Sequence, residues 1–212
     1  MAITAYHSYH HGGAASAPVV IAFHGTGGDE HQFVELVHDV LPDASLMAPR
    51  ADVSEFSANR FFRRTGEGVY DMQDLAFRTG KMLGFVESIR SRYTGRPIYA
   101  LGYSNGANIL AAMLFERPGL FDRAALLHPL IPWTPRPQPG LRGRPVFISA
   151  GENDPICPLP RSLELIDWFA AQGASVETLI EPGGHSIGPQ ELAGLEGFPT
   201  RHQQTGDLNE PD

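Results

Sequence analysis

The 212-residue chain has a single cysteine, few basic residues and no long apolar run. One cysteine excludes an internal disulfide, which fits a reducing compartment. The formal net charge of −8 argues against nucleic acid or an anionic membrane surface as a partner. No stretch approaches the roughly 18 apolar residues of a membrane span, and the N-terminus lacks the basic start and apolar run of a signal peptide. These absences predict a cytoplasmic protein that binds neither nucleic acid nor membrane.

The rest of the composition is that of an ordinary globular protein. Hydrophobic residues make up 42% and charged residues 19% of the chain, so a core of useful size can be buried. A chain of 212 residues suits one domain. We therefore predict a single domain over residues 1–212, with an N-terminal strand or hairpin region at 1–17 and a polar, frayed tail at 197–212.

Short apolar runs alternate with amphipathic helical patterns along the chain. Residues 19–23, for example, read VVIAF and lie between a proline and a glycine-rich loop, as expected of a buried strand. Such alternation predicts an α/β fold with a mostly parallel central sheet flanked by helices on both faces. The predicted strands are 19–23, 45–49, 97–101, 124–131, 145–151 and 175–181, and the predicted helices are 74–93, 106–116 and 161–173.

The segment GYSNG at residues 102–106 contains a candidate nucleophile, Ser104. A Gly-x-Ser-x-Gly pattern alone is weak evidence, because glycine and serine are common in turns. Here a predicted strand ends and a predicted helix begins at the serine, which is the setting of a nucleophile elbow. Such a turn lifts the hydroxyl above the sheet edge and directs the positive end of the helix dipole at developing negative charge.

A serine hydroxyl needs a base, and the chain order serine, acid, histidine is typical of hydrolases with this elbow. Asp154 and Glu152 both follow the strand 145–151, and we favour Asp154, which precedes a turn-forming proline. His185 follows the last predicted strand in a glycine loop, whereas His128 precedes the acid and a third histidine lies in the polar tail. The sequence thus predicts Asp154 and His185 as the partners of the serine.

A glycine-rich segment, FHGTGGDE at residues 23–30, follows the first predicted strand. In a hydrolase this loop supplies one oxyanion donor, for which we predict the backbone N–H of Thr26, and the elbow supplies the other through Asn105. The rival interpretation is a phosphate-binding loop. The pattern disfavours it, since Glu30 stands where a third glycine belongs and no Gly-Lys-Ser/Thr follows.

The segment RFFRRTGEGVYD at residues 60–71 allows two interpretations. In one, the phenylalanines pack on the body of the protein and the arginines pair with nearby acids. In the other, Phe61 and Phe62 line the substrate pocket, and Arg63 or Arg64 meets a substrate carboxylate. The two interpretations are evenly matched at this point.

Three histidines near the N-terminus, His7, His10 and His11, could suggest a metal site. They lack a set of partner ligands of the kind that metal sites require. We therefore expect a hydrated strand end there and predict no metal.

Six segments together resemble the small phospholipase/carboxylesterase family of α/β-hydrolases, and within it the MhqD-like (YpfH/YahD-type) hydrolases. They are FHGTGGDE, RFFRR, GVYDMQDL, LGYSNGANI, AGENDPICP and PGGHS, and the likeness runs from about residue 18 to residue 192. The resemblance implies an α/β-hydrolase fold without a large lid domain, acting on a small ester without a metal or organic cofactor. It places the nucleophile on Ser104, the acid on Asp154, the base on His185 and the oxyanion amides on Thr26 and Asn105. The family usually ends on a longer amphipathic helix than the residues after His185 provide.

The resulting prediction is a serine carboxylesterase that hydrolyses short-chain esters through an acyl-enzyme. A thioesterase or lysophospholipase-like hydrolase would use the same machinery, and a catalytically silent binding module is a third hypothesis. We predict a preference for acyl chains of roughly C2 to C6, because the longest loops, 52–71 and 132–144, are too short for a helical cap. The natural substrate and the oligomeric state, a homodimer included, are not specified by the sequence.

Overall fold

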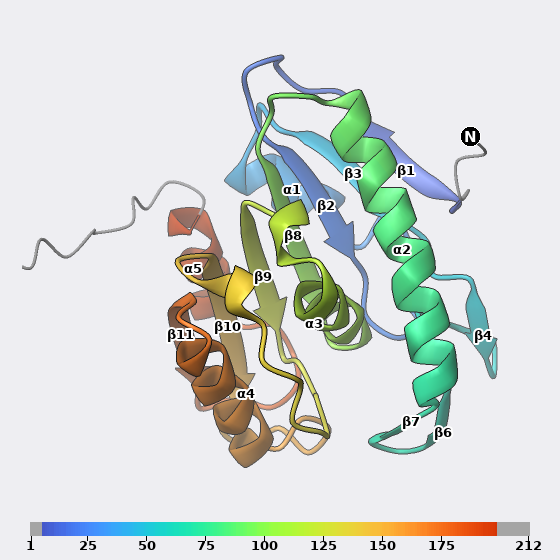
Figure 1. Ribbon diagram of the computed structural model, residues 1–212, viewed down its shortest axis with the longest axis vertical. Coiled ribbons are helices and arrows are strands. Elements are labelled where there is room, and N and C mark those ends of the chain that lie inside the picture. The colour runs from blue at the N-terminus through green and yellow to red at the C-terminus, as the bar shows by residue number, and fades with distance from the viewer. Residues whose placement is uncertain (1–5, 199–212) are drawn as a thin grey trace, which may run out of the picture.

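A computed structural model describes residues 6–198 and contains a central seven-stranded sheet (Figure 1). Its strands are β1 (Ser8–His11), β2 (Val19–Phe23), β3 (Ser45–Pro49), β8 (Ile98–Tyr103), β9 (Arg123–Leu127), β10 (Pro145–Gly151) and β11 (Ser175–Glu181). The strand order is β1-β3-β2-β8-β9-β10-β11, and each neighbouring pair is parallel except β1 with β3. The helices are α1 (Val34–Val40), α2 (Met72–Arg92), α3 (Asn105–Glu116), α4 (Leu159–Ala171) and α5 (Pro189–Gly197), with short 3₁₀ helices at Pro118–Leu120 and Pro139–Leu141. The predicted α/β fold with a mostly parallel sheet is confirmed.

Side chains of the central strand β2 alternate between two apolar layers. Val19, Ile21 and Phe23 lie in the larger layer, together with residues of α2, α3 and α4. Val20 and Ala22 lie in the other layer, together with residues of α1 and α5. Burial on both faces explains why this run is hydrophobic at every position. Figure 1 shows the resulting arrangement of helices on both sides of the sheet.

The carboxyl ends of the parallel strands meet at one edge of the sheet, the lower edge in Figure 1. β8 extends to Tyr103, two residues beyond the prediction, so Ser104 is the first residue past the strand. β9 is shorter than predicted and ends at Leu127, after which His128 has a φ of 49°. This left-handed conformation takes the backbone out of extended geometry and ends the strand. Ligand sites of open α/β sheets lie at this kind of edge.

The segment between β3 and α2 forms two β-hairpins rather than the predicted loop. β4 (Val53–Glu55) pairs with β5 (Ala58–Arg60), and β6 (Arg64–Gly66) pairs with β7 (Val69–Tyr70). The two central residues of the first turn have φ values of 49° and 68°, as in the tight turns that match strand twist. Each strand is only two or three residues long, which is too short for a periodic sequence signal. Figure 1 shows β6 and β7 at the lower end of α2.

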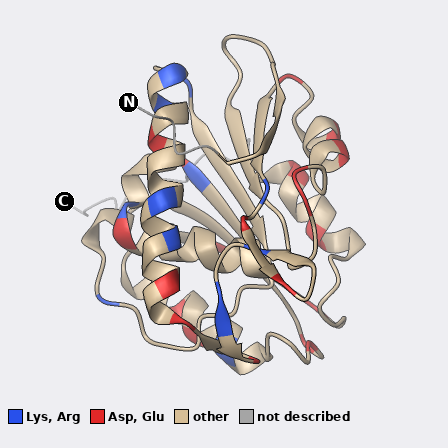
Figure 2. Ribbon diagram, turned by 90° about the vertical axis from the view of Figure 1, so that its right-hand side faces the viewer, with Lys and Arg blue, Asp and Glu red and all other residues tan. Residues whose placement is uncertain are grey.

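A side-chain cap stabilises the N-terminal end of α2, and positive charge stabilises its C-terminal end. The Asp71 carboxylate accepts a hydrogen bond from the backbone N–H of Asp74 at 3.0 Å, which satisfies one free donor of the first turn. Arg90 and Arg92 lie in the last turn, where positive charge complements the helix dipole. Figure 2 shows basic and acidic residues along α2, whereas α1 carries acidic residues and no Lys or Arg.

Both ends of the described chain pack against the sheet. Within the N-terminal region, β1 pairs with β3 and forms an edge strand of the sheet. At the other end, Phe198 packs on Phe147, with ring centroids 5.7 Å apart. A Cβ on Gly194 would lie 3.0 Å from the Phe147 ring, so glycine permits this close approach. The predicted frayed tail falls almost entirely on residues 199–212, outside the described residues. Within residues 6–198, none of the helices combines the length and apolar character needed to cross a membrane.

Candidate active site

Ser104 occupies a sharp turn between β8 and α3. Its backbone has φ 52° and ψ −117°, a conformation that L-residues rarely adopt. The flanking glycines allow the turn. A Cβ on Gly102 would lie 2.5 Å from the carbonyl oxygen of Gly106, and a Cβ on Gly106 would lie 2.1 Å from that of Phe23. The GYSNG segment thus forms a strained strand-to-helix elbow with the serine at its tip.

Three side chains from different strand ends form one hydrogen-bonded chain. The Ser104 hydroxyl lies 2.9 Å from Nε2 of His185, and Nδ1 of His185 lies 2.7 Å from Oδ2 of Asp154. Since an ionised carboxylate only accepts, Nδ1 carries the proton and Nε2 can accept from the hydroxyl. The structure therefore brings together the serine, histidine and aspartate named from the sequence, although the serine and the histidine are 81 residues apart.

Asp154 is held as a carboxylate by backbone donors. Its Oδ1 accepts from the N–H groups of Ile156 and Cys157, each at 2.8 Å, and its side chain is fully buried. Burial raises the pKa of this carboxyl, but the hydrogen bonds that it accepts lower the pKa by more. Glu152, the alternative acid, is exposed on the same loop. The structure thus places Asp154, rather than Glu152, against His185.

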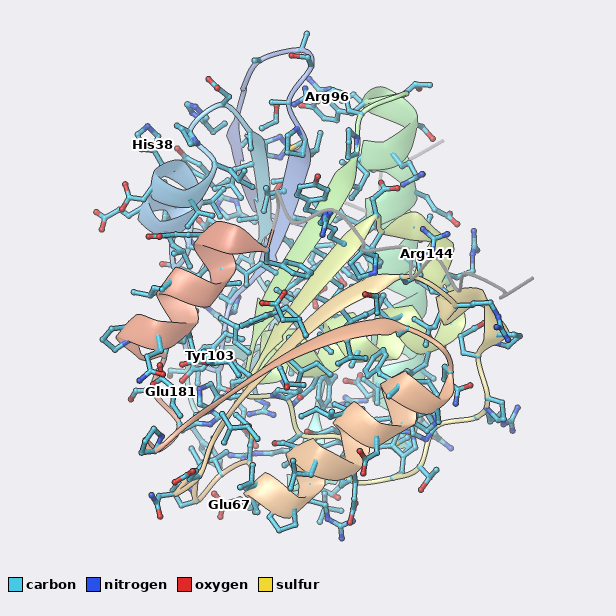
Figure 3. All side chains as sticks on the ribbon, turned by 90° about the vertical axis from the view of Figure 1, so that its left-hand side faces the viewer. His38, Glu67, Arg96, Tyr103, Arg144 and Glu181 are labelled. Atoms are coloured by element: carbon cyan, nitrogen blue, oxygen red, sulfur yellow. The ribbon has the colours of Figure 1, made fainter. Side chains whose placement is uncertain are left out.

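Tyr103 supports the loop that carries His185. Its hydroxyl donates to the carbonyl oxygen of His185 at 2.7 Å, and the centroids of the two rings are 5.3 Å apart. A Cβ on Gly151 would lie 2.2 Å from the carbonyl oxygen of Gly184, so glycine lets this loop cross the end of β10. Figure 3 shows Tyr103 just below α5. An aromatic residue at a strand end gives no signal of this role in the sequence.

Thr26 and Asn105 lie on the wall of the cavity that also holds the serine. Asn105 is the first residue of α3, so its N–H has no acceptor within the helix. His24 shapes the Thr26 loop, because its Nε2 accepts from the N–H of Ala51 at 3.0 Å and its Nδ1 donates to the carbonyl of Gly25 at 2.7 Å. Burial lowers the pKa of His24 and so favours the neutral ring that this pair of bonds requires. The arrangement is that expected for two backbone donors to an oxyanion.

The cavity beside Ser104 has a volume of about 320 Å³. Ser104 and His185 line it from the strand ends, which form one wall, and Arg60, Arg64 and Glu67 line it from the hairpin segment, which forms another wall. Glu67 lies at the lower edge of the molecule in Figure 3. A cavity of this size falls at the small end of the range for small-molecule sites.

Phe61 and Phe62 do not line this cavity, in contrast to the interpretation that they wall the pocket. Both rings are buried in the apolar layer that includes α2, where they pack edge-to-face against Phe23 and Tyr70. Burying a phenylalanine ring contributes about 1.5–3 kcal/mol, which explains why both rings face the core. The backbone N–H of Phe61 donates to the side-chain oxygen of Asn105 at 2.7 Å and ties the hairpin segment to the elbow.

Arg63 and Arg64 point in different directions, as neighbours in an extended segment do. The Arg63 side chain is 62% exposed, with nitrogens 3.7 Å from Asp71 and 3.3 Å from Asp74. Arg64 lines the cavity, and its Nε donates to the two carboxylate oxygens of Glu55 at 3.0 and 3.1 Å. Each interpretation of this segment thus holds for part of it, since Arg63 pairs with acids while Arg64 reaches the cavity.

A second histidine contacts the same carboxylate as His185. Nδ1 of His128 lies 3.0 Å from Oδ2 of Asp154, and its Nε2 lies 3.1 Å from Oε1 of Glu191. Both His128 and Glu191 are buried. The chain order disfavours His128 as the base, and the signal that could have found it is a histidine directly after a buried strand. Nothing in the sequence marks Glu191.

Among the described residues, one group brings metal-binding atoms together. Atoms of His128, Asp154 and His185 lie within 4.8 Å of one another. The nitrogen–oxygen contacts in this group, 2.7 and 3.0 Å, are hydrogen bonds that already orient the side chains, so we assign no metal there. The N-terminal histidines are not part of this group. That the protein uses no metal stays a prediction.

The fold and the site together define the class of protein. A mostly parallel sheet between two helical layers is followed at its carboxyl edge by a strained serine elbow, then by an aspartate and a histidine on later strand ends. These are the features of the α/β-hydrolase fold.

The chain belongs to the carboxylesterase family of α/β-hydrolases, as its resemblance in sequence predicts. It is 39% identical to MhqD of Bacillus subtilis (strain 168) over 188 residues. This aligned region covers 87% of this chain and 92% of MhqD. The structure is similar to that of the Bacillus cereus carboxylesterase, with a TM-score of 0.85, 36% identity and coverage of 90% of this chain and 92% of that one. It is also similar to YahD, solved with malic acid, with a TM-score of 0.84, 25% identity and coverage of 92% and 98%. No family model matches the sequence.

Proposed function

We propose that the protein is a serine carboxylesterase that cleaves short-chain esters through an acyl-enzyme. The observation that carries the proposal is the chain of hydrogen bonds from Ser104 through His185 to Asp154 on the wall of a cavity. Similarity to the Bacillus cereus carboxylesterase supports the same reaction class.

In the proposed reaction, His185 takes the proton of the Ser104 hydroxyl as its oxygen attacks the ester carbonyl carbon. The backbone N–H groups of Thr26 and Asn105 stabilise the negative charge that develops on the carbonyl oxygen. Asp154 holds the imidazole in the required tautomer and stabilises its charged form. His185 then protonates the leaving alcohol. A water molecule, deprotonated by the same histidine, attacks the acyl-enzyme carbonyl; the bond to the Ser104 oxygen breaks, and His185 returns the proton to that oxygen as the acid leaves.

The size of the cavity supports a preference for small substrates. Its volume is about 320 Å³, and residues 53–70 form two short hairpins where a helical cap would otherwise extend the site. Each buried methylene contributes about 0.8 kcal/mol, so the gain stops once the acyl chain leaves the cavity. We therefore expect kcat/KM to be highest for acyl chains of roughly C2 to C6.

The arginines that line the cavity support a preference for esters that carry a free carboxylate. Arg60 and Arg64 outnumber Glu67 among the charged residues that line the cavity. Glu55 contacts Nε of Arg64, and a guanidinium has further N–H groups that bind a carboxylate in a paired geometry. The similar protein YahD was solved with malic acid, a dicarboxylic acid.

A panel of p-nitrophenyl esters of rising acyl length tests the reaction and the size preference together. We expect saturable hydrolysis that is fastest for short chains, and covalent labelling of Ser104 by a fluorophosphonate probe. A maximum at about C12 or longer would contradict the small site, and failure of both hydrolysis and labelling would favour a silent binding module. Oxygen and thiol esters of one acyl chain, compared on the same enzyme, test the thioesterase hypothesis.

A further inference from the structure

His128 and Glu191 form a buried pair that the proposed reaction does not use. His128 is 1% exposed and Glu191 is 0% exposed. Nε2 of His128 lies 3.1 and 3.2 Å from the two carboxylate oxygens of Glu191, and its Nδ1 lies 3.0 Å from Oδ2 of Asp154. His185 reaches that same oxygen at 2.7 Å. The Asp154 carboxylate is thus shared by two imidazole rings.

The contacts of His128 define its protonation state. Glu191 also accepts from the N–H of Gly188 at 2.7 Å, and Asp154 also accepts from two backbone N–H groups. Both carboxyls are acceptors in these contacts, as ionised carboxylates are. A neutral imidazole donates from one nitrogen only, whereas an imidazolium donates from both. His128, which faces a carboxylate at each nitrogen, is therefore held as an imidazolium.

The electrostatic surroundings agree with this assignment. Burial lowers the pKa of His128, but the hydrogen bonds and charges of Glu191 and Asp154 raise the pKa by more. Burial raises the pKa of Glu191, and its hydrogen bonds from His128 and Gly188 lower the pKa by more. Arg60, Arg64 and His185 line the same cavity. The other polar or titratable groups against this network are Tyr103, Ser104, Ser149, Cys157 and Glu181.

We propose that His128 is a positioning residue which, as an imidazolium between Glu191 and Asp154, fixes the carboxylate oxygen that orients His185. The inference rests on the proposed role of His185 as the base. The two imidazole centroids are 5.3 Å apart, and both rings contact Oδ2 of Asp154. Glu191 supplies the negative charge that keeps His128 protonated despite its burial. The consequence is an Asp154 carboxylate that is held in place on the side away from the base.

Nitrogen NMR of the native chain, labelled with ¹⁵N-histidine, tests the protonation state without reference to activity. We expect both ring nitrogens of His128 to carry protons at about pH 7, with its signals identified by their absence from His128→Asn. A ring that carries one proton at that pH would overturn the proposal. If the protein hydrolysed no ester, the proposed function would fail while this measurement still decided the state of His128.

The split between kcat and KM tests the consequence for the base. In His128→Asn kcat should fall by roughly tenfold with little change in KM, because the charge-assisted hydrogen bond from the imidazolium to Asp154 is gone. Asparagine suits the site, since position 128 has a φ of 49° that asparagine tolerates, and its amide can still donate to Asp154. Glu191→Gln should lower kcat in the same way, because it removes the negative charge that keeps His128 protonated. His38→Asn, at an exposed position on α1, is the control and should match the wild type.

The two experiments separate a positioning role from a merely structural one. An unchanged kcat in folded His128→Asn, or a loss that falls on KM alone, would overturn the proposal. If His128→Asn does not fold, the NMR result on the native chain decides.

Discussion

The two walls of the cavity differ in what holds them. The Ser104 wall is built from strand ends, where the backbone is so close that a Cβ does not fit at Gly106 or Gly151. The other wall is built from the hairpins β4 to β7, where Arg64 is oriented by a side-chain pair with Glu55. Close-packed backbone tolerates little displacement, whereas a solvent-accessible ion pair contributes only about 0–1 kcal/mol. The proposed chemistry therefore lies on the rigid wall of strand ends, and substrate choice depends on the adjustable wall of hairpins.

Two contacts join the walls. Nη1 of Arg60 donates to the hydroxyl of Thr26 at 2.9 Å, and the N–H of Phe61 donates to the side chain of Asn105 at 2.7 Å. Both contacts end on residues proposed to bind the oxyanion. The adjustable wall is therefore anchored where it meets the rigid one, and its outer part, with Arg64, is freer to vary.

The largest effect should come from removing the hydroxyl of the rigid wall. We expect Ser104→Ala to lower kcat by about a millionfold on every ester, with unchanged thermal unfolding, because no other group replaces the nucleophile. Ester hydrolysis and circular dichroism measure the two quantities. Ser91→Ala, at an exposed position on α2, is the control and should keep full activity. If Ser104→Ala retained more than about a tenth of the rate, with contamination excluded, the nucleophile would lie elsewhere.

The next effect concerns the acid on the same wall. Asp154→Asn should lower kcat by roughly ten-thousandfold, because an amide neither holds the required imidazole tautomer nor stabilises its charge. Glu152→Gln, on the same loop but exposed, should stay near the wild-type rate. Steady-state kinetics on one short ester compares them, and the opposite ranking would make Glu152 the orienting carboxylate.

Adding a methyl group at a glycine should destabilise the elbow of the rigid wall but not an exposed helix surface. Gly106→Ala should lower the free energy of unfolding by about 1–3 kcal/mol, because its Cβ would lie 2.1 Å from the carbonyl oxygen of Phe23. Gly80→Ala in α2, where a Cβ meets nothing within 4 Å, should instead raise it by up to about 1 kcal/mol. Urea unfolding of both variants measures the difference. Equal effects would contradict the rigidity assigned to the elbow.

The smallest effect should come from the adjustable wall. Arg64→Gln should lower kcat/KM by roughly tenfold for an ester with a free carboxylate, the value of one charge-assisted hydrogen bond, and much less for a neutral ester of the same size. Arg63→Gln is the matched control, because Arg63 faces solvent beside Asp71 and Asp74. Kinetics on the paired esters tests this, and a loss of equal size on both esters, or in both variants, would remove Arg64 from substrate recognition.

Much of the fold could be predicted from the sequence because its signals are local. The apolar run of β2 records burial on both faces of a parallel sheet. The glycines on either side of Ser104 indicate a turn in which the backbone leaves no room for a Cβ. The same holds for part of the site, since Ser104, Asp154 and His185 each follow a strand end, and parallel strands bring their carboxyl ends to one edge. The fold and the family are confirmed, while the catalytic roles of these residues stay predictions.

The sequence by itself determined the alternation of strands and helices, the elbow and the chain order of three polar side chains. Only the tertiary structure decided that Phe61 turns into the core while Arg64 turns into the cavity, because side-chain direction in short, irregular strands depends on what packs against them. It also decided that His128 meets Asp154 on one side and Glu191, 63 residues away in the chain, on the other. Protonation of a buried imidazole is set by partners from distant elements, and no local pattern of residues records which elements will meet.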